Sequence, residues 1–213
     1  MLEPKLPEEL RDEMLEEQVT AAIEAGLDVE GCRFYGEDMP DLTGERIEFS
    51  GCHFEKCTFP KYASERLVLV DCVLDGCDLT GMVFARATLQ RVAFRRCRMT
   101  GAQFTEAVLM NVSFVQCGLD YACFAETKAQ HLLMEDCALK ECGIFRFRWQ
   151  DWVLRHCVLR QAEIQETSLR GLDVTGCDID GITVDLTAVR GLRVTRDQAM
   201  LLSALLGLVI ADP

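Results

Sequence analysis

The chain has 213 residues, of which 49% are hydrophobic and 27% are charged, which excludes an intrinsically disordered segment. Its net charge of −13 disfavours direct binding to nucleic acid or to an anionic membrane surface, and it permits a basic partner. No apolar run is long enough to cross a bilayer, and the first residues lack the features of a secretory signal. We therefore expect no membrane association and a cytoplasmic location.

The first expected element is an amphipathic helix over residues 8–25. Its apolar residues recur at helical spacing on one face, and the segment is bounded by Pro7 and Gly26. These apolar residues are Leu10, Met14, Leu15, Val19, Ala22 and Ile23. Stacked β-coils need a cover for their apolar ends, so residues 1–26 are expected to form an N-terminal capping helix.

From about Leu27 to Val194 the chain repeats every five residues. In steps of five from Phe34, the residue is large and apolar except at Gly44, Ser64 and Ala129, and the frame never slips. The position two residues earlier is mostly small or apolar. This period fits neither a helix nor an extended strand, so the chain must turn a corner after each unit. Four units with one corner each close a square 20-residue coil, and stacked coils pair as short parallel strands.

Individual units carry a recognisable signature. The units at residues 77–81 and 102–106 resemble the A-(D/N)-L-x-x motif of pentapeptide-repeat proteins. The resemblance implies an all-β solenoid, a right-handed quadrilateral β-helix, of about eight coils over residues 27–195 with a capping helix at each end. It extends over 33 units in one frame, which an ordinary α/β domain does not explain.

The 12 cysteines follow the same register. Eleven occupy the small inward position and only Cys123 does not. One column is complete and contains Cys57, Cys77, Cys97, Cys117, Cys137, Cys157 and Cys177. A metal ladder or a redox relay is one interpretation, but the spacing of zinc ligands is missing and parallel stacking suits disulfides poorly. Buried cysteine as a small apolar residue is the favoured interpretation, with no metal and no cofactor.

Residues 145–152 contain three large aromatic side chains. Phe147 and Trp152 are oversized for the small inward position, and Trp149 lies between them. A ligand-binding aromatic cluster and a local repacking of a swollen coil both explain this stretch, and repacking is favoured.

Thr195 and Gln198 form a capping-box pattern at the start of the C-terminal module, residues 196–213, which predicts a helix there. The apolar residues after Gly207 predict a short strand that follows this helix. This module either caps its own coil or caps it and dimerises. Residues 190–210 resemble the C-terminal end of the Qnr/MfpA-like subfamily of quinolone-resistance proteins. The resemblance implies a homodimer through Leu201, Leu202, Leu205, Leu206, Leu208 and Ile210. It also implies a rod that mimics DNA and binds DNA gyrase or topoisomerase IV. The unbroken frame predicts coils without the projecting loops of Qnr proteins.

Charge is distributed unevenly over the expected rod. Residues 1–60 hold 16 acidic and 5 basic residues. Over residues 31–196, the two sides centred on the Met39 and Gly44 columns carry 14 acids and 8 bases, and the other two sides carry 8 acids and 12 bases. The residues expected to bind a basic groove of a partner are Asp38, Asp41, Glu45, Glu65, Asp78, Glu106, Asp120 and Glu126. A solvated face with scattered ion pairs is the alternative.

No catalytic constellation is recognisable. The three histidines fall on outward positions, away from the inward thiols, and no phosphate-binding or hydrolase motif is present. Two non-enzymatic functions are therefore left. One is a topoisomerase-binding mimic of DNA, and the other is an interaction scaffold for an unknown partner.

Overall fold

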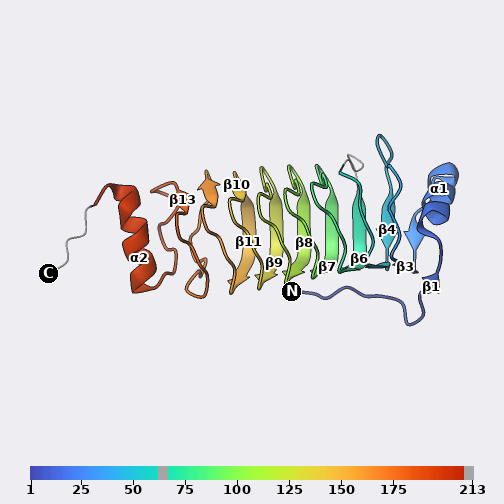
Figure 1. Cartoon of the computed structure of the whole chain (residues 1–213), viewed down its shortest axis with the longest axis horizontal. Helices are drawn as coiled ribbons and strands as arrows, with labels where there is room; N and C mark the ends of the chain where they lie inside the picture. Colours follow the sequence, from blue (N-terminus) through green and yellow to red (C-terminus); the bar gives the residue numbers. More distant parts are fainter. Residues whose placement is uncertain (62–66, 209–213) are drawn as a thin grey trace.

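The structure is a computed structural model that describes residues 1–61 and 67–208. These residues form a straight parallel β-helix of about eight coils, with helix α1 (Leu15–Ala25) at one end and α2 (Arg196–Ser203) at the other (Figure 1). A short 3₁₀ turn that follows α2 covers Ala204–Leu206. The solenoid predicted from the period of five is confirmed.

Most strands belong to one parallel sheet. Each strand pairs with the equivalent strand of the next coil, as in Leu69 with Leu89. The sheet contains β1 (Arg11–Asp12), β2 (Val29–Glu30), β3 (Cys32–Tyr35), β4 (Glu48–Ser50), β5 (His53–Glu55), β6 (Val68–Asp75), β7 (Thr88–Arg95), β8 (Val108–Val115), β9 (Lys128–Glu135) and β11 (Arg148–Arg155). A second sheet contains β10 (Gly143–Phe145), β12 (Glu163–Gln165) and β13 (Thr183–Val184).

Each coil has four sides, which are numbered 1 to 4 in chain order. Each side is named by one large inward residue at its centre, and the equivalent residues 20 positions apart form a column. Side 1 is centred on the Phe49 column, side 2 on Phe54, side 3 on Phe59 and side 4 on Phe84. The long strands β6 to β9 and β11 bend around the corner between sides 1 and 2. At this corner Asp71, Arg91 and Asn111 have φ of 52–56°, the left-handed conformation that lets the chain turn without losing its register.

The core runs along the axis of the rod and is filled by the inward residues. The phenylalanines of sides 2 and 4 are fully buried, and rings one coil apart stack, for example Phe84 on Phe104 at 4.7 Å between centroids. The apolar side chains that the period of five placed inside are therefore mostly buried, whereas Trp149, Val189 and Val194 near the C-terminal end are partly buried.

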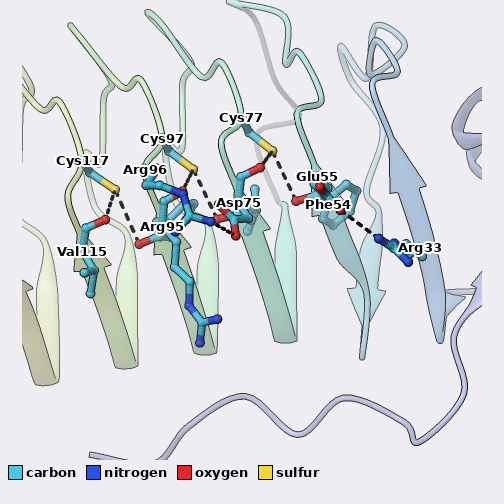
Figure 2. A network of polar contacts seen from close by, with 12 residues as sticks. Arg33, Phe54, Glu55, Asp75, Cys77, Arg95, Arg96, Cys97, Val115 and Cys117 are labelled. Atoms are coloured by element: carbon cyan, nitrogen blue, oxygen red, sulfur yellow. Dashed lines mark hydrogen bonds and ion pairs between the residues drawn. The ribbon is translucent and has the colours of Figure 1, made fainter.

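Eleven of the twelve cysteines are buried and all are free, as predicted. They do more than fill space, because the thiols of the main column lie near backbone carbonyls (Figure 2). Cys97 Sγ donates to the carbonyl oxygens of Leu74 at 3.3 Å and Arg95 at 3.4 Å. Thr127 makes the equivalent contacts from the opposite column through its hydroxyl, which donates to the carbonyl oxygen of Phe104 at 2.6 Å. The inward position thus favours a small side chain that can also donate a weak hydrogen bond.

The N-terminal segment differs from the prediction. Helix α1 begins at Leu15, not at residue 8, because residues 11–12 form β1 and pair with β3. The backbone N–H of Arg11 donates to the Gly31 carbonyl at 2.9 Å, which holds this part of the chain extended. The first N–H of the helix is satisfied by the carboxylate of Glu37 at 2.7 Å. Of the predicted apolar face, Leu15, Val19 and Ala22 are buried, whereas Met14 is exposed.

Residues 1–10, called the N-terminal strap below, run along the outside of the rod from β8 towards β1 (Figure 1). The backbone N–H of Leu2 donates to Asn111 Oδ1 at 2.8 Å, and that of Lys5 donates to Asp71 Oδ1 at 2.9 Å. Pro7 crosses the corner at Gly51, where an added Cβ would lie 3.1 Å from its ring. No pattern in the sequence predicts the strap.

The first coil contains an irregular side. Gly44, with φ of 83°, is exposed at the position where later coils bury a phenylalanine such as Phe84. Leu42 and Ile47 on either side are buried, so residues 43–46 leave the core and return. Figure 1 shows this segment rising beyond the edge of the coils next to β4. This short projection falls in the first coil, where Gly44 breaks the inward pattern and the sequence left the geometry open, and it does not interrupt the frame of five.

The aromatic stretch is accommodated without loss of register. Phe147 and Trp152 are buried with centroids 5.1 Å apart, and β11 keeps its 20-residue pairing with β9. Half-buried Trp149 donates its indole N–H to the Ser168 carbonyl at 2.7 Å. In the described part of the chain, the sheet on sides 1 and 2 ends at β11, so the large rings fill the coil where pairing stops.

Helix α2 covers the C-terminal end of the core. Its capping box is formed, with the Gln198 N–H donating to Thr195 Oγ1 at 3.2 Å and the Thr195 N–H donating to Gln198 Oε1 at 2.9 Å. The buried Gln198 amide also donates to the carbonyls of Val174 at 2.7 Å and Cys177 at 2.8 Å. One side chain thus starts the helix and fastens it to the last complete coil.

Candidate interaction surfaces

The predicted acidic residues lie on sides 3 and 4 and on the corners that border them. Asp38 and Asp78 share one row of side 3, two coils apart, through bridges with Thr58. Asp38, Asp41 and Glu45 are exposed in the first coil. Glu65 lies outside the described residues. The 20-residue register therefore brings the described carboxylates to one part of the rod.

Three of these carboxylates are neutralised by arginines from neighbouring coils. Arg86 pairs with Glu106 at 3.2 Å, Arg98 pairs with Asp78 at 3.6 Å, and Arg146 pairs with Glu126. The partners occupy the same position in successive coils, so the sequence register already contained the signal for these pairs. The charge that sides 3 and 4 offer to a partner is smaller than the number of acids indicates.

Two of the predicted acids contact groups other than basic side chains. Asp41 accepts hydrogen bonds from the Thr43 hydroxyl at 2.6 Å and backbone N–H at 2.9 Å, which lower the pKa of its carboxyl. Asp120 accepts from the Lys140 backbone N–H at 2.9 Å. These bonds orient the carboxylates and leave their negative charge in place. Asp41 and Asp120, with exposed Asp38, are therefore the strongest candidates for contact with a basic partner.

The predicted dimer residues lie on and after α2. Leu201 is 45% exposed and Leu208 is 58% exposed, whereas Leu202 and Leu205 are half-buried against the last coil. The side chain of Leu206 and all of Ile210 lie outside what the structure describes. Between α2 and the coil is an apolar groove of about 360 Å³, lined by Leu186, Val189, Leu192, Val194, Ala199, Leu202, Ser203 and Leu205. The leucines thus divide into a capping set and an outward set.

The histidines make no contact with the inward thiols. His131 Nδ1 lies 2.8 Å from Asp151 on the corner between sides 1 and 2, and His156 Nδ1 lies 3.4 Å from Asp136 on the next corner. Among the described residues, no three His, Cys, Asp or Glu side chains are placed to hold a metal ion. In the same part of the chain, no helix has the length and apolarity to cross a bilayer.

Comparison with known proteins supports the fold at the level of sequence. Residues 47–124 match the family model described as a pentapeptide repeat region. The chain therefore contains a pentapeptide repeat region over these residues. No curated protein sequence matches it.

Several solved structures resemble this chain at low identity. A trypsin-treated form of QnrB1, a plasmid-mediated fluoroquinolone resistance protein, is 18% identical over 86% of this chain and 99% of that chain, with a TM-score of 0.38. HetL, involved in heterocyst differentiation regulation in Nostoc sp. strain PCC 7120, is 14% identical over 85% and 95%, with a TM-score of 0.35. Rfr23 from Cyanothece 51142 is 14% identical over 84% and 99%, with a TM-score of 0.22.

Proposed function

We propose that this protein is a non-enzymatic homodimeric rod that mimics duplex DNA and binds a type II topoisomerase, DNA gyrase or topoisomerase IV. The observation that carries the proposal is the line of carboxylates on sides 3 and 4 of a straight solenoid, which are exposed at Asp38 and Asp41 in the first coil. Successive coils rise about 4.8 Å, so Asp38 and Asp78 are separated by about 10 Å along the axis. A stiff rod with negative charge along one side is complementary to a basic groove that binds DNA.

The dimer is the second part of the proposal. Exposed Met200, Leu201 and Leu208 form an apolar end at the C-terminus, and burying such residues against a second copy is favourable. A dimer through this end doubles the length of the rod. It also places the acidic first coils at the two distal tips, where they are free to enter a groove.

A supercoiling assay tests the proposal. Purified protein at micromolar concentration is added to DNA gyrase and to topoisomerase IV, with and without a fluoroquinolone. We expect inhibition of the enzyme or protection from the drug, and the triple variant Asp38→Asn, Asp41→Asn, Asp120→Asn should weaken it at least tenfold. The matched control is the double variant Glu106→Gln, Glu126→Gln, which removes carboxylates that already carry an arginine partner.

The ion pairs favour a second candidate function. Because Arg86, Arg98 and Arg146 neutralise three of the predicted carboxylates, the rod also fits a scaffold for a partner unrelated to topoisomerases. The same assay separates the two functions. Unchanged supercoiling at micromolar protein, with or without drug, contradicts the DNA mimic and leaves the scaffold.

A further inference from the structure

Side 2, which lies opposite side 4 and borders side 3, carries an unusual row of outward residues. Val73, Ala93, Ser113, Leu133 and Val153 are neighbours in register on successive coils. The first three are only 5%, 1% and 5% exposed although they point away from the core. Leu133 is half-buried, and Val153 is 40% exposed. An outward row that is apolar and partly buried needs a cover over its first part.

The N-terminal strap passes this first part of the row. Its two anchors, Asn111 and Asp71, lie on the corner that borders side 2, in the coils of Ser113 and Val73. Three residues of extended chain span about 10 Å, and two coils also rise about 10 Å. The backbone N–H groups of Leu2 and Lys5, three residues apart, therefore reach side chains that lie two coils apart on the same corner. This match of periods explains why both Leu2 and Lys5 find an acceptor.

The next acceptor in this series is Asp151. It lies on the same corner column as Asp71 and Asn111, two coils beyond Asn111, with φ of 55°. Its carboxylate is held by His131 at 2.8 Å, as that of Asp71 is held by Arg91. Asp151 is 60% exposed, and the start of the strap lies beside β8, two coils before β11. Beside it lies Val153, the exposed continuation of the apolar row.

We propose that Leu133, Val153 and Asp151, called the side 2 patch, bind an extended segment of a partner protein that continues the line of the strap. The segment donates a backbone N–H to Asp151 and places an apolar side chain on Leu133 and Val153. The strap itself provides the chemical description of the occupant. The occupant is, like the strap, an extended segment rich in leucine and proline. Its prolines help to keep it extended before it binds. Side 2 takes no part in the proposed contact with a topoisomerase, so this inference is independent of that function.

The probe is a synthetic ten-residue peptide with the sequence of residues 1–10, labelled with fluorescein and titrated into the full-length protein. We expect saturable binding in the micromolar to millimolar range. Val153→Glu and Asp151→Ala should each weaken it at least tenfold, and Val153→Thr should change it less than threefold. Methylation of the peptide nitrogens at Leu2 and Lys5 removes the donors that can reach Asp151, so it should also weaken binding at least tenfold.

Three controls make the result decisive. Tyr121→Glu, an exposed residue on another corner, should leave binding unchanged, and circular dichroism should show that all variants fold. Absence of saturable binding, or binding that Val153→Glu does not change, overturns the proposal. A change of affinity in either direction with Asn111→Ala places the peptide in the strap's own site and also overturns it. If Val153→Glu changes the oligomeric state of the full-length protein, measured by light scattering, the occupant is a second copy and the assignment to a partner is wrong.

Discussion

The guanidinium of Arg91 makes two hydrogen bonds of 2.6 Å with the carboxylate of Asp71, its neighbour one coil earlier on the corner between sides 1 and 2. The same carboxylate accepts the backbone N–H of Lys5 from the strap. Both side chains are less than one-fifth exposed. Asp71 therefore joins three segments of the chain, the strap and two consecutive coils, at one point.

Replacing Asp71 with Ala should remove all of these bonds and leave Arg91 without its partner. Charge-assisted hydrogen bonds in a partly buried place contribute about 2 kcal/mol to stability, and we expect a loss of this size. Urea denaturation checks the free energy of unfolding. Hydrogen exchange should also show faster exchange of the Leu2 and Lys5 amides. The variant Glu106→Ala, which breaks an exposed pair, should cost less than about 1 kcal/mol.

Asp71 also predicts how stability depends on pH. The hydrogen bonds from Arg91 lower the pKa of its carboxyl below the ordinary value of about 3.9. A lowered folded-state pKa means that the stabilisation is fully present above about pH 4 and is lost as the pH falls further. The difference in stability between wild type and Asp71→Asn should be constant from pH 7 to about pH 5 and should shrink below pH 4. A difference that grows on acidification would contradict this assignment.

The thiols should differ sharply in reactivity. Burial raises the pKa of Cys142 to about 12, and contact with the thiol of Cys117 together with burial raises the pKa of Cys97 to about 12. Only the thiolate is reactive, but access decides here, because all eleven buried thiols are shielded from solvent, including Cys52 and Cys137, whose pKa is lowered by hydrogen bonds from neighbouring thiols. Titration with a thiol reagent at pH 8 should modify Cys123 alone in the native protein and all 12 thiols after unfolding. Cys123→Ser should abolish the native reaction, and several reactive native thiols would contradict the buried column.

Gln198 should be critical for the C-terminal cap. Its amide makes two buried hydrogen bonds to the last complete coil, and its replacement by Ala leaves two carbonyls unsatisfied. We expect a loss of about 2–3 kcal/mol, measured by thermal unfolding. Thr195→Ala, which removes only the hydroxyl of the capping box, is the matched variant and should cost about 1 kcal/mol. Equal effects of the two substitutions would show that the contact with the coil contributes nothing.

The proposed dimer can be separated from the cap by choosing between exposed and half-buried leucines. Leu201→Glu changes an outward residue, so it should convert a dimer to a folded monomer in light scattering with little loss of stability. Leu202→Glu and Leu205→Glu should also split the dimer, but they should lower the melting temperature because these side chains pack on the core. A monomeric wild-type protein would refute the dimer.

The sequence predicted the parts of the fold that depend on side-chain pattern. Large apolar residues every five positions, such as Phe84 and Phe104, cannot face water in every coil, so the period determined the inside of the rod and the 20-residue register. The same register implied the pair Arg86–Glu106, since Glu106 takes the position of Arg86 in the next coil. The acidic sides were therefore predictable in position, and their partial neutralisation could have been predicted as well.

The strap and the start of α1 could not be predicted in this way. Leu2 and Asn111 are far apart in the sequence, and their contact uses a backbone N–H that nearly any residue provides. Leu10 and Met14 fit helical spacing, yet the N–H of Arg11 pairs with Gly31 and keeps this segment extended. The exposure of Gly44 was only hinted at by the loss of a large side chain at that position. Backbone contacts to a distant coil leave no periodic trace in the sequence.

The strap has a consequence for how the length of this solenoid can change. Most contacts in the rod are repeated from one coil to the next, so the gain or loss of a whole coil preserves them. The strap is different, because it is fixed at Gly31 through β1 and at Asn111 through Leu2, and its length matches one particular number of intervening coils. Duplications and deletions should therefore be tolerated beyond Asn111 and selected against before it. The two attachment points of the strap therefore set the number of coils in the N-terminal half, whereas the number of coils in the C-terminal half can vary.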